Sequence, residues 1–314
     1  MKTTTARLAL PALAALLALP LGGCKLPYQI LSKLVAPKPT PTPTPMPAQP
    51  IAAEFRQFTE DRVRGEGQSP SAEVTAELVG TKQSDVAAVR VVAKRAVDDL
   101  GTDLLPGKPE EAYFESVSHG SSGEDEGPLA VTVKMKNAPR KAKLLKEVTA
   151  EAELYMPAVD PAATVTIPNF LGEAGKPVVN PVLQAAGVEI TLLSKEQIEA
   201  ERKAYGEKKR AEAKTYLQGE ALETAVRFAT ENFLASSWVN AYLKVKDPKG
   251  AIFDYVFVKP SGEVEGINRG GEEGYVSLSA QGGEVGPDWG LQVRLKTPRT
   301  FARYTFTLKD VALP

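Results

Sequence analysis

Short segments in which apolar and polar residues alternate recur along most of the chain beyond residue 70. In "LAVTVKMKN", residues 129–137, one face of an extended chain carries Leu129, Val131, Val133 and Met135, with alanine, threonine and lysine between them. This period of two predicts a strand with one buried and one solvated face, which is typical of antiparallel sheets. The segments with this pattern are 72–80, 88–97, 129–137, 149–157, 163–170, 188–193, 241–247, 251–260, 289–297 and 303–314.

The residues between these segments favour tight turns. Asp247-Pro248-Lys249-Gly250 separates two predicted strands, and Pro260-Ser261-Gly262 follows the second of them. Proline presets its backbone angle for a turn, and glycine adopts the left-handed conformation that many turns need. Many short strands with such punctuation predict a mainly β fold, an antiparallel β-sandwich built as one unit or as two smaller sandwiches.

One segment, about 194–236, follows a helical pattern instead. Ser194 and Gln197 have the spacing of a capping box, which marks a helix start. The second half carries Leu222, Val226 and Phe233 at helical spacing, and Gly219 separates it from a mostly charged first half. We expect a helical pair inserted between strands, with the second helix packed on the sandwich. A partner-binding coiled segment is the alternative, but one or two heptads are too few to support it.

The N-terminus has the layout of an export signal. A basic start is followed by an apolar run at 8–21 and then by Leu21-Gly22-Gly23-Cys24. The run is too short for a stable membrane-spanning helix, and the order of parts is that of a secretory signal peptide. The four residues resemble the lipobox of bacterial lipoproteins, which implies cleavage after residue 23 and a diacylglycerol on the Cys24 thiol. The alternative is an ordinary secreted protein with a chance cysteine.

The segment 24–50 then predicts an anchored tether. Proline occupies nearly every second position of "PKPTPTPTPMPAQP", residues 37–50, which predicts an extended polyproline spacer of roughly 40 Å at about 3.1 Å per residue. Two or more acyl chains hold a protein firmly at a membrane. Lys25 stands where an aspartate marks inner-membrane retention in the best-studied lipoproteins, so the resemblance favours the outer membrane. We therefore expect a cell-envelope protein whose β domain, 51–314, stands off a membrane on its N-terminal lipid.

Composition narrows the classes of partner. The formal net charge of the chain is −1, so there is no overall electrostatic footprint for nucleic acid. Cys24 is the only cysteine, which leaves no disulfide to stabilise the β domain. At this length a hydrophobic core suffices for stability.

Three stretches of the β domain resemble one group of exported bacterial β-rich proteins without an assigned activity. They are "AVDDLGTDLLP" (96–106), "NAPRKAKLLKEVTAEAELYMP" (137–157) and "YTFTLKDVALP" (304–314). The matching positions are Asp98, Asp99, Gly101, Asp103, Leu104, Arg140, Ala142, Phe306, Leu308, Asp310, Leu313 and Pro314. The chain departs from the group at Val148, Ala150 and Val311, where leucine, glycine and isoleucine are usual. The resemblance implies a β-sandwich and no catalytic residues.

Candidate chemistry is sparse. His119 is the only histidine and lies among small and acidic residues, so neither a catalytic triad nor a zinc site is expected. The carboxylates at 124–126 and at 98–103 would suit calcium, but neither has the order of a calcium loop. For 98–103 we expect a turn in which aspartate accepts bonds from backbone amides and Gly101 has a positive φ. No phosphate-binding glycine motif occurs, and no cofactor or metal site is predicted.

The glycine-rich tract 261–290 predicts loops at one end of a sandwich, where such folds place binding sites. Trp289 and Tyr275 are the candidate ligand-binding residues there, and Trp238 is a further aromatic that could stack on a sugar ring. A lone tryptophan at a strand start more often belongs to the core.

These features favour a non-enzymatic lipoprotein that binds or scaffolds an envelope protein or glycan. The alternatives are a surface-displayed glycan-binding or adhesive domain and, third, a hydrolase that uses loop carboxylates.

Overall fold

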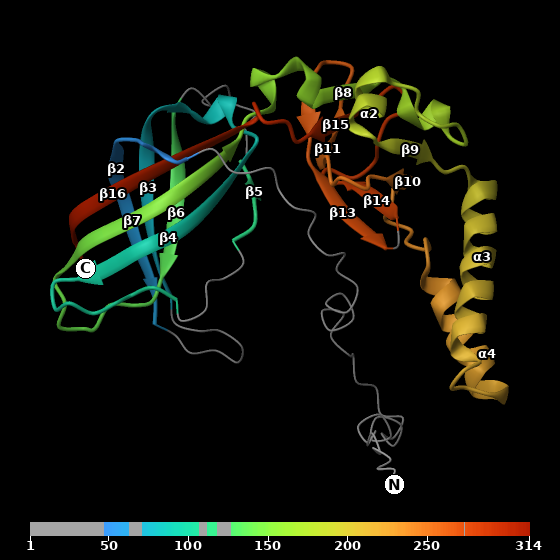
Figure 1. The fold of residues 1–314 in the computed structure, drawn as a ribbon, viewed down its shortest axis with the longest axis horizontal. Coiled ribbons are helices and arrows are strands. Elements are labelled where there is room, and N and C mark those ends of the chain that lie inside the picture. Colours follow the sequence, from blue (N-terminus) through green and yellow to red (C-terminus); the bar gives the residue numbers. More distant parts are fainter. Residues whose placement is uncertain (1–46, 63–70, 107–111, 118–126, 273) are drawn as a thin grey trace, which may run out of the picture. The chain divides into compact units, whose positions relative to one another are not determined.

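The computed structural model describes residues 47–62, 71–106, 112–117, 127–272 and 274–314 (Figure 1). The prediction of a mainly β fold is confirmed, since 46% of the residues are in strands and 21% in helices. The lipobox with Cys24, the spacer residues 37–46, His119 and the acidic residues 124–126 lie outside the described residues, so those predictions stay predictions. The spacer prediction is wrong at its end, because Gln49 and Pro50 form a short strand that pairs with residues 304–305 at the edge of a sheet.

The first two sheets pack face to face, and their strands cross (Figure 1). One has the order β1-β16-β7-β4-β5, in which only the short β1–β16 pair is parallel, and the other has the order β2-β3-β6. Their strands are β1 (Gln49–Pro50), β16 (Phe301–Ala312), β7 (Leu144–Tyr155), β4 (Ala88–Asp98), β5 (Glu115–Ser116), β2 (Ala53–Asp61), β3 (Ser71–Lys82) and β6 (Pro128–Met135).

Alternation along these strands produces the first hydrophobic core. In β3, Ala72, Val74, Ala76 and Leu78 are all buried, and the residues between them are not. Leu129, Val131, Val133 and Met135 of β6 are buried in the same way. Beyond them, β7 and β16 contribute buried residues that include Leu145, Val148, Phe306 and Leu308. The predicted pattern of one buried and one solvated face is thus confirmed.

The second core lies in the sequence between β7 and β16. Two further antiparallel sheets have the orders β13-β14-β10-β9 and β12-β11-β15-β8. Their strands are β8 (Thr164–Ile167), β9 (Glu189–Leu192), β10 (Ala241–Lys246), β11 (Ile252–Val258), β12 (Val264–Glu265), β13 (Ile267–Glu272), β14 (Tyr275–Ala280) and β15 (Gly290–Leu295). Because β7 and β16 pair along most of their length, the second core is an insertion into the first sandwich.

Among the described residues, helices lie only in the connections between strands. The α-helices are α2 (Pro181–Ala186), α3 (Lys195–Ala213) and α4 (Gly219–Asn232), and the short 3₁₀ turns are η2 (Gln83–Asp85), η3 (Pro157–Val159), η4 (Pro161–Ala163) and η5 (Phe170–Glu173). Ser194 and Gln197 form the predicted capping box, and α4 begins at the predicted break, Gly219.

The prediction that the second helix packs on the sandwich is wrong for most of its apolar face. Leu222 and Val226 of α4 form a small cluster with Ala213 and Leu217, at the end of α3. Only Phe233, just beyond α4, reaches a sheet, where its ring meets Tyr275 of β14 edge-on at 5.2 Å. The apolar face of α4 is therefore covered mainly by the end of α3, while α3 itself is bonded to the sheet through Glu201, which accepts from Lys244 and Tyr275.

Candidate functional site

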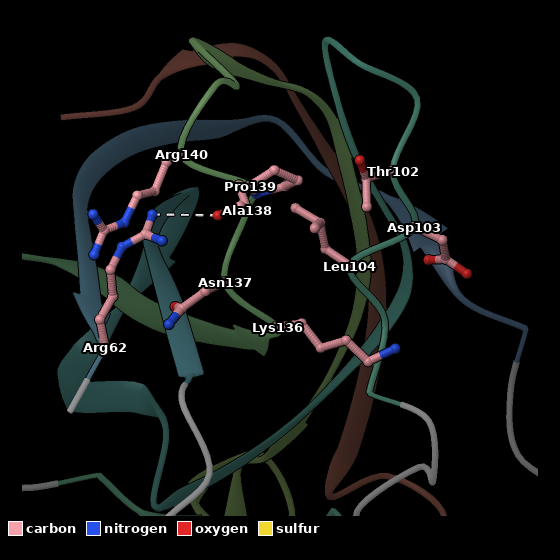
Figure 2. A pocket seen from close by; sticks show the side chains of 9 residues that line it. All are labelled: Arg62, Thr102, Asp103, Leu104, Lys136, Asn137, Ala138, Pro139 and Arg140. Atoms are coloured by element: carbon pink, nitrogen blue, oxygen red, sulfur yellow. Dashed lines mark hydrogen bonds between the residues drawn. The ribbon is translucent and has the colours of Figure 1, made fainter. Parts of the chain in front are cut away.

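An open cavity of about 370 Å³ lies at one end of the first sandwich (Figure 2). It forms where the loop after β4 meets the loop between β6 and β7. Its lining residues are Arg62, Thr102, Asp103, Leu104, Lys136, Asn137, Ala138, Pro139 and Arg140.

Asp98 shapes the first of these loops. Its side chain is fully buried, and one carboxylate oxygen accepts bonds from the amides of Leu100, at 2.9 Å, and Thr102, at 2.7 Å. Gly101 has a φ of 81°, a backbone conformation that residues other than glycine rarely adopt. The predicted turn at 98–103, capped by aspartate, is therefore confirmed.

Backbone bonds hold the two loops together. The amide of Leu104 donates to Ala96 O, and the amide of Lys136 donates to Leu104 O, each at 2.8 Å. The amide of Lys143 donates to the Asp99 carboxylate at 3.1 and 3.2 Å. These bonds fix the backbone of Leu104 and Lys136 in the cavity wall.

The third stretch of the resemblance ends at the same place. The amide of Leu313 donates to Lys143 O at 2.9 Å, and Leu313 packs against the first core. Asp310 has a φ of 53° and interrupts the pairing of β16 with β7. The structure thus brings the stretches 96–106, 137–157 and 304–314 together at one end of the sandwich, where their shared residues set loop geometry.

Cationic side chains dominate the cavity. Arg62 donates to both carboxylate oxygens of Glu60, at 2.6 and 2.8 Å, and to Ala138 O at 3.2 Å. The hydrogen bond to Glu60 raises the pKa of Arg62. Within the described part of the chain, Lys136 and Arg140 have no ion-pair partner, and both are exposed. Among the described residues that line the cavity, Asp103 is the only carboxylate.

Figure 2 shows how these charges are distributed. The guanidinium groups of Arg62 and Arg140 lie on one side of the view, and Lys136 and Asp103 lie on the other. Asn137 lies between them, and its amide nitrogen donates to Asp61 O at 2.7 Å. The amide oxygen of Asn137 is buried and has no hydrogen-bond partner among the residues that the structure describes. Since Glu60 already neutralises Arg62, Arg140 and Lys136 are the charges left for a ligand.

The chemistry of this lining suits binding of an anion. Arginine and lysine form charge-assisted hydrogen bonds with carboxylate and phosphate groups. Hydrolysis of sugars needs two carboxyl groups on either side of the bond, whereas this cavity has one. No group of three or more His, Cys, Asp or Glu side chains in the described ranges is arranged to hold a metal ion.

Sequence reasoning singled out Asp103, Leu104 and Arg140 of this cavity, through the resemblance, but missed the others. Arg62 follows β2, a strand that was not predicted because a bulge between Phe55 and Gln57 breaks its alternation. Lys136 and Asn137 come directly after a predicted strand. The basic residues Lys136 and Arg140, on either side of Pro139, were the feature of the sequence that could have indicated this cavity.

The two aromatic candidates lie apart, in different sheets. Trp289 is half-buried at the start of β15, where it meets Phe257 at 6.4 Å and has the Lys259 ammonium 5.5 Å from its ring centre. Tyr275 of β14 donates its hydroxyl to Glu201 at 2.6 Å and so holds α3 against the sheet. Both contribute packing contacts, and the structure does not combine them into one site. Trp238, by contrast, is 84% exposed.

No family model, curated protein or solved structure matches this chain. Among the described residues, no helix is both long and apolar enough to span a bilayer.

Proposed function

We propose that this chain is a non-enzymatic, lipid-anchored binding protein of the bacterial cell envelope. The cavity at the end of the first sandwich holds an anionic group of an envelope component, a carboxylate or a phosphate. The observation that carries this proposal is the pair Lys136 and Arg140, two cations without an ion-pair partner in the described structure, at the rim of a cavity that contains one carboxylate.

The framework around the cavity supports binding by a preformed site. Asp98 and Asp99 hold the loops through backbone amides, so a ligand would meet side chains on a fixed frame. A preformed site binds more tightly because less conformational entropy is lost on binding. The lipobox at Leu21–Cys24 and the Thr-Pro spacer would place this site at the membrane surface within reach of envelope polymers.

Retention of the purified full-length chain on isolated envelope polymers tests the proposal. Peptidoglycan supplies carboxylates, lipopolysaccharide supplies phosphates, and a neutral polysaccharide is the blank. We expect one of the two anionic polymers to retain the chain at low salt. Each charge-assisted bond contributes about 1.5–3 kcal/mol, so K136E/R140E should weaken retention at least about tenfold.

The variant K214E/K249E is the matched control, because it reverses two exposed lysines that do not line the cavity. Equal weakening by both variants would show that retention depends on the overall charge of the chain and not on the cavity. Retention by neither polymer, or full retention of K136E/R140E, would contradict the proposal.

The anchor has its own test. Cells fed a radiolabelled fatty acid should label the wild-type chain, and Cys24→Ala should remove that label. A labelled C24A variant would contradict lipid attachment at this residue.

A further inference from the structure

Another open cavity, of about 400 Å³, lies in the second core between the sheet that contains β11 and the sheet that contains β13. No residue of the first sandwich lines it, so this cavity is separate from the one that contains Lys136 and Arg140. Its lining residues are Val245, Asp247, Ile252, Tyr255, Arg269, Gly270, Gly271 and Val276.

The cavity exists because two positions of β13 that face the core carry no apolar side chain. Arg269 pairs with Leu278, and Gly271 pairs with Val276, between β13 and β14. Directly paired residues of antiparallel strands lie on the same face of a sheet, and Leu278 is fully buried in the second core. A Cβ at Gly271 would lie 2.5 Å from Tyr275 O, so this position cannot carry a side chain unless the backbone shifts.

The hydroxyl of Tyr255 is a hydrogen-bond donor without a partner. Tyr255 lines the cavity, belongs to the second core and is only 2% exposed. None of the residues that the structure describes bonds its hydroxyl, whereas buried tyrosine hydroxyls usually have a partner. The fully enclosed side-chain atoms without a partner in the described ranges belong to Asp98 and Asn137, so the Tyr255 hydroxyl keeps some exposure toward the cavity. Burial raises the pKa of Tyr255, so the hydroxyl is protonated at neutral pH.

Arg269 supplies a positive charge to the same cavity. Its guanidinium donates to Phe253 O at 3.5 Å and has no ion-pair partner among the described residues. The charge of Arg269 opposes the effect of burial on the pKa of Tyr255, which indicates that the two groups lie near each other. Asp247 is the one carboxylate among the described lining residues, and both of its oxygens accept bonds from backbone amides at 2.8 Å. Asp247 therefore holds the turn, and Arg269 is free to bind a ligand.

Two further charged groups lie near Arg269 but do not line the cavity. Burial raises the pKa of Asp254 and lowers that of Lys296, and both groups also respond to the charge of Arg269. Neither forms an ion pair with Arg269 in the described part of the chain. Because their charges are opposite, they offset each other and leave the charge of Arg269 at the cavity.

We propose that this cavity binds a small carboxylate with an apolar body, such as a medium-chain fatty acid. The carboxylate accepts hydrogen bonds from the Arg269 guanidinium and the Tyr255 hydroxyl, both of which are charge-assisted. The apolar body contacts Val245, Ile252 and Val276, three half-buried side chains of the wall. The cavity volume of about 400 Å³ lies within the range of small-molecule sites, about 300–1,000 Å³.

Equilibrium dialysis of the purified full-length chain with radiolabelled octanoate tests the site. We expect saturable binding of one octanoate per chain, with competition by unlabelled octanoate and not by octanamide, which has no charge. R269Q should weaken binding at least about tenfold, and Y255F at least about threefold, because each removes a charge-assisted hydrogen bond.

Three variants with unchanged cavity residues are the controls. R227Q and Y216F alter an exposed arginine and an exposed tyrosine that do not line the cavity, so both should bind octanoate like the wild-type chain. K136E/R140E should also bind octanoate normally, which separates this site from the cavity of the first sandwich.

Urea unfolding distinguishes a binding role of Tyr255 from a structural one. Because its hydroxyl has no bond to lose within the described residues, Y255F should leave the urea midpoint unchanged or raise it. A lower midpoint would show that the hydroxyl already has a partner in the chain, which contradicts the proposal. Glu273 lies outside the described residues, and E273Q should leave octanoate affinity unchanged. Tighter binding by E273Q would show that this carboxylate already occupies Arg269.

Three further results would overturn the proposal. They are no saturable octanoate binding, equal competition by octanamide, and equal weakening by R269Q and R227Q. The second result would make the cavity an apolar pocket that does not recognise a carboxylate, and the third would attribute binding to the overall charge of the chain.

Discussion

Asp98→Ala should destabilise the first core and leave the second core nearly unchanged. The Asp98 carboxylate bonds the amides of Leu100 and Thr102 at 2.9 and 2.7 Å from a fully buried position. Two hydrogen bonds to a charged acceptor contribute about 3–6 kcal/mol together. The other carboxylate oxygen has no partner in the described part of the chain, and its removal relieves about 1–3 kcal/mol of desolvation cost. The expected net loss is thus roughly 0–5 kcal/mol, with about 2.5 kcal/mol as the central value.

Two optical signals separate the cores in a urea titration. Both tryptophans, Trp238 and Trp289, lie in the inserted part of the chain, so their fluorescence reports on the second core. Far-ultraviolet circular dichroism reports on both cores. We expect D98A to shift a circular dichroism transition to lower urea while the fluorescence transition stays in place.

Asp98→Asn is the control, because it keeps an acceptor for Leu100 and Thr102. Its loss of stability should be about 1 kcal/mol, since a neutral acceptor bonds less strongly than a carboxylate. Equal losses for D98N and D98A, or a shift in fluorescence alone, would refute the claim that this side chain holds the cavity loop.

Three further outcomes follow from single contacts. A Cβ at Gly206 would lie 2.6 Å from the Thr230 hydroxyl, so G206A should destabilise the packing of α3 against α4 by about 1–3 kcal/mol. Adding T230A should restore the packing, and greater hydrogen-exchange protection of these helices in G206A would contradict this prediction. Tyr155 donates to Leu295 O at 2.9 Å in a buried position, so Y155F should cost about 1–2 kcal/mol in denaturant unfolding, and an unchanged midpoint would count against it. Burial raises the pKa of Glu201, but hydrogen bonds from Lys244 and Tyr275 outweigh it and lower that pKa below its usual value. Its stabilisation is therefore present above the unfolded-state pKa, near 4.5, and lost as the pH falls through the lowered folded value. E201Q should flatten the acid limb of the stability profile, and an unchanged limb would show that Glu201 does not contribute.

Strand positions were predictable where alternation is uninterrupted, as in β3 and β6, because one buried face leaves a direct mark on the sequence. The same pattern was lost in β2, where a bulge shifts the register after Phe55. α2 was missed although its signals are present, with Asn180 as a cap, Pro181 at the first turn and Gly187 at φ 78° beyond the end. Its six residues are too few to show a helical period.

The cavity was only partly predictable, since its walls come from loops that are distant in sequence. Asp99 bonds Lys143, and Lys143 bonds Leu313, contacts that no local pattern reveals. The aromatic candidates show the opposite case, in which the sequence suggests a binding role and the structure shows packing. Trp289 and Tyr275 are the residue types that bind sugars, but their rings already contact Phe257 and Phe233. Residue type alone does not distinguish a packing aromatic from a binding one.

Site-specific photocrosslinking in cells tests the central claim most directly. A photoreactive amino acid would replace Thr102, which lines the cationic cavity, or Trp238, which is 84% exposed elsewhere. We expect a crosslink to an anionic envelope polymer from position 102, and its loss when K136E/R140E is added. A polymer crosslinked only from position 238, or one that persists from position 102 in K136E/R140E, would contradict it.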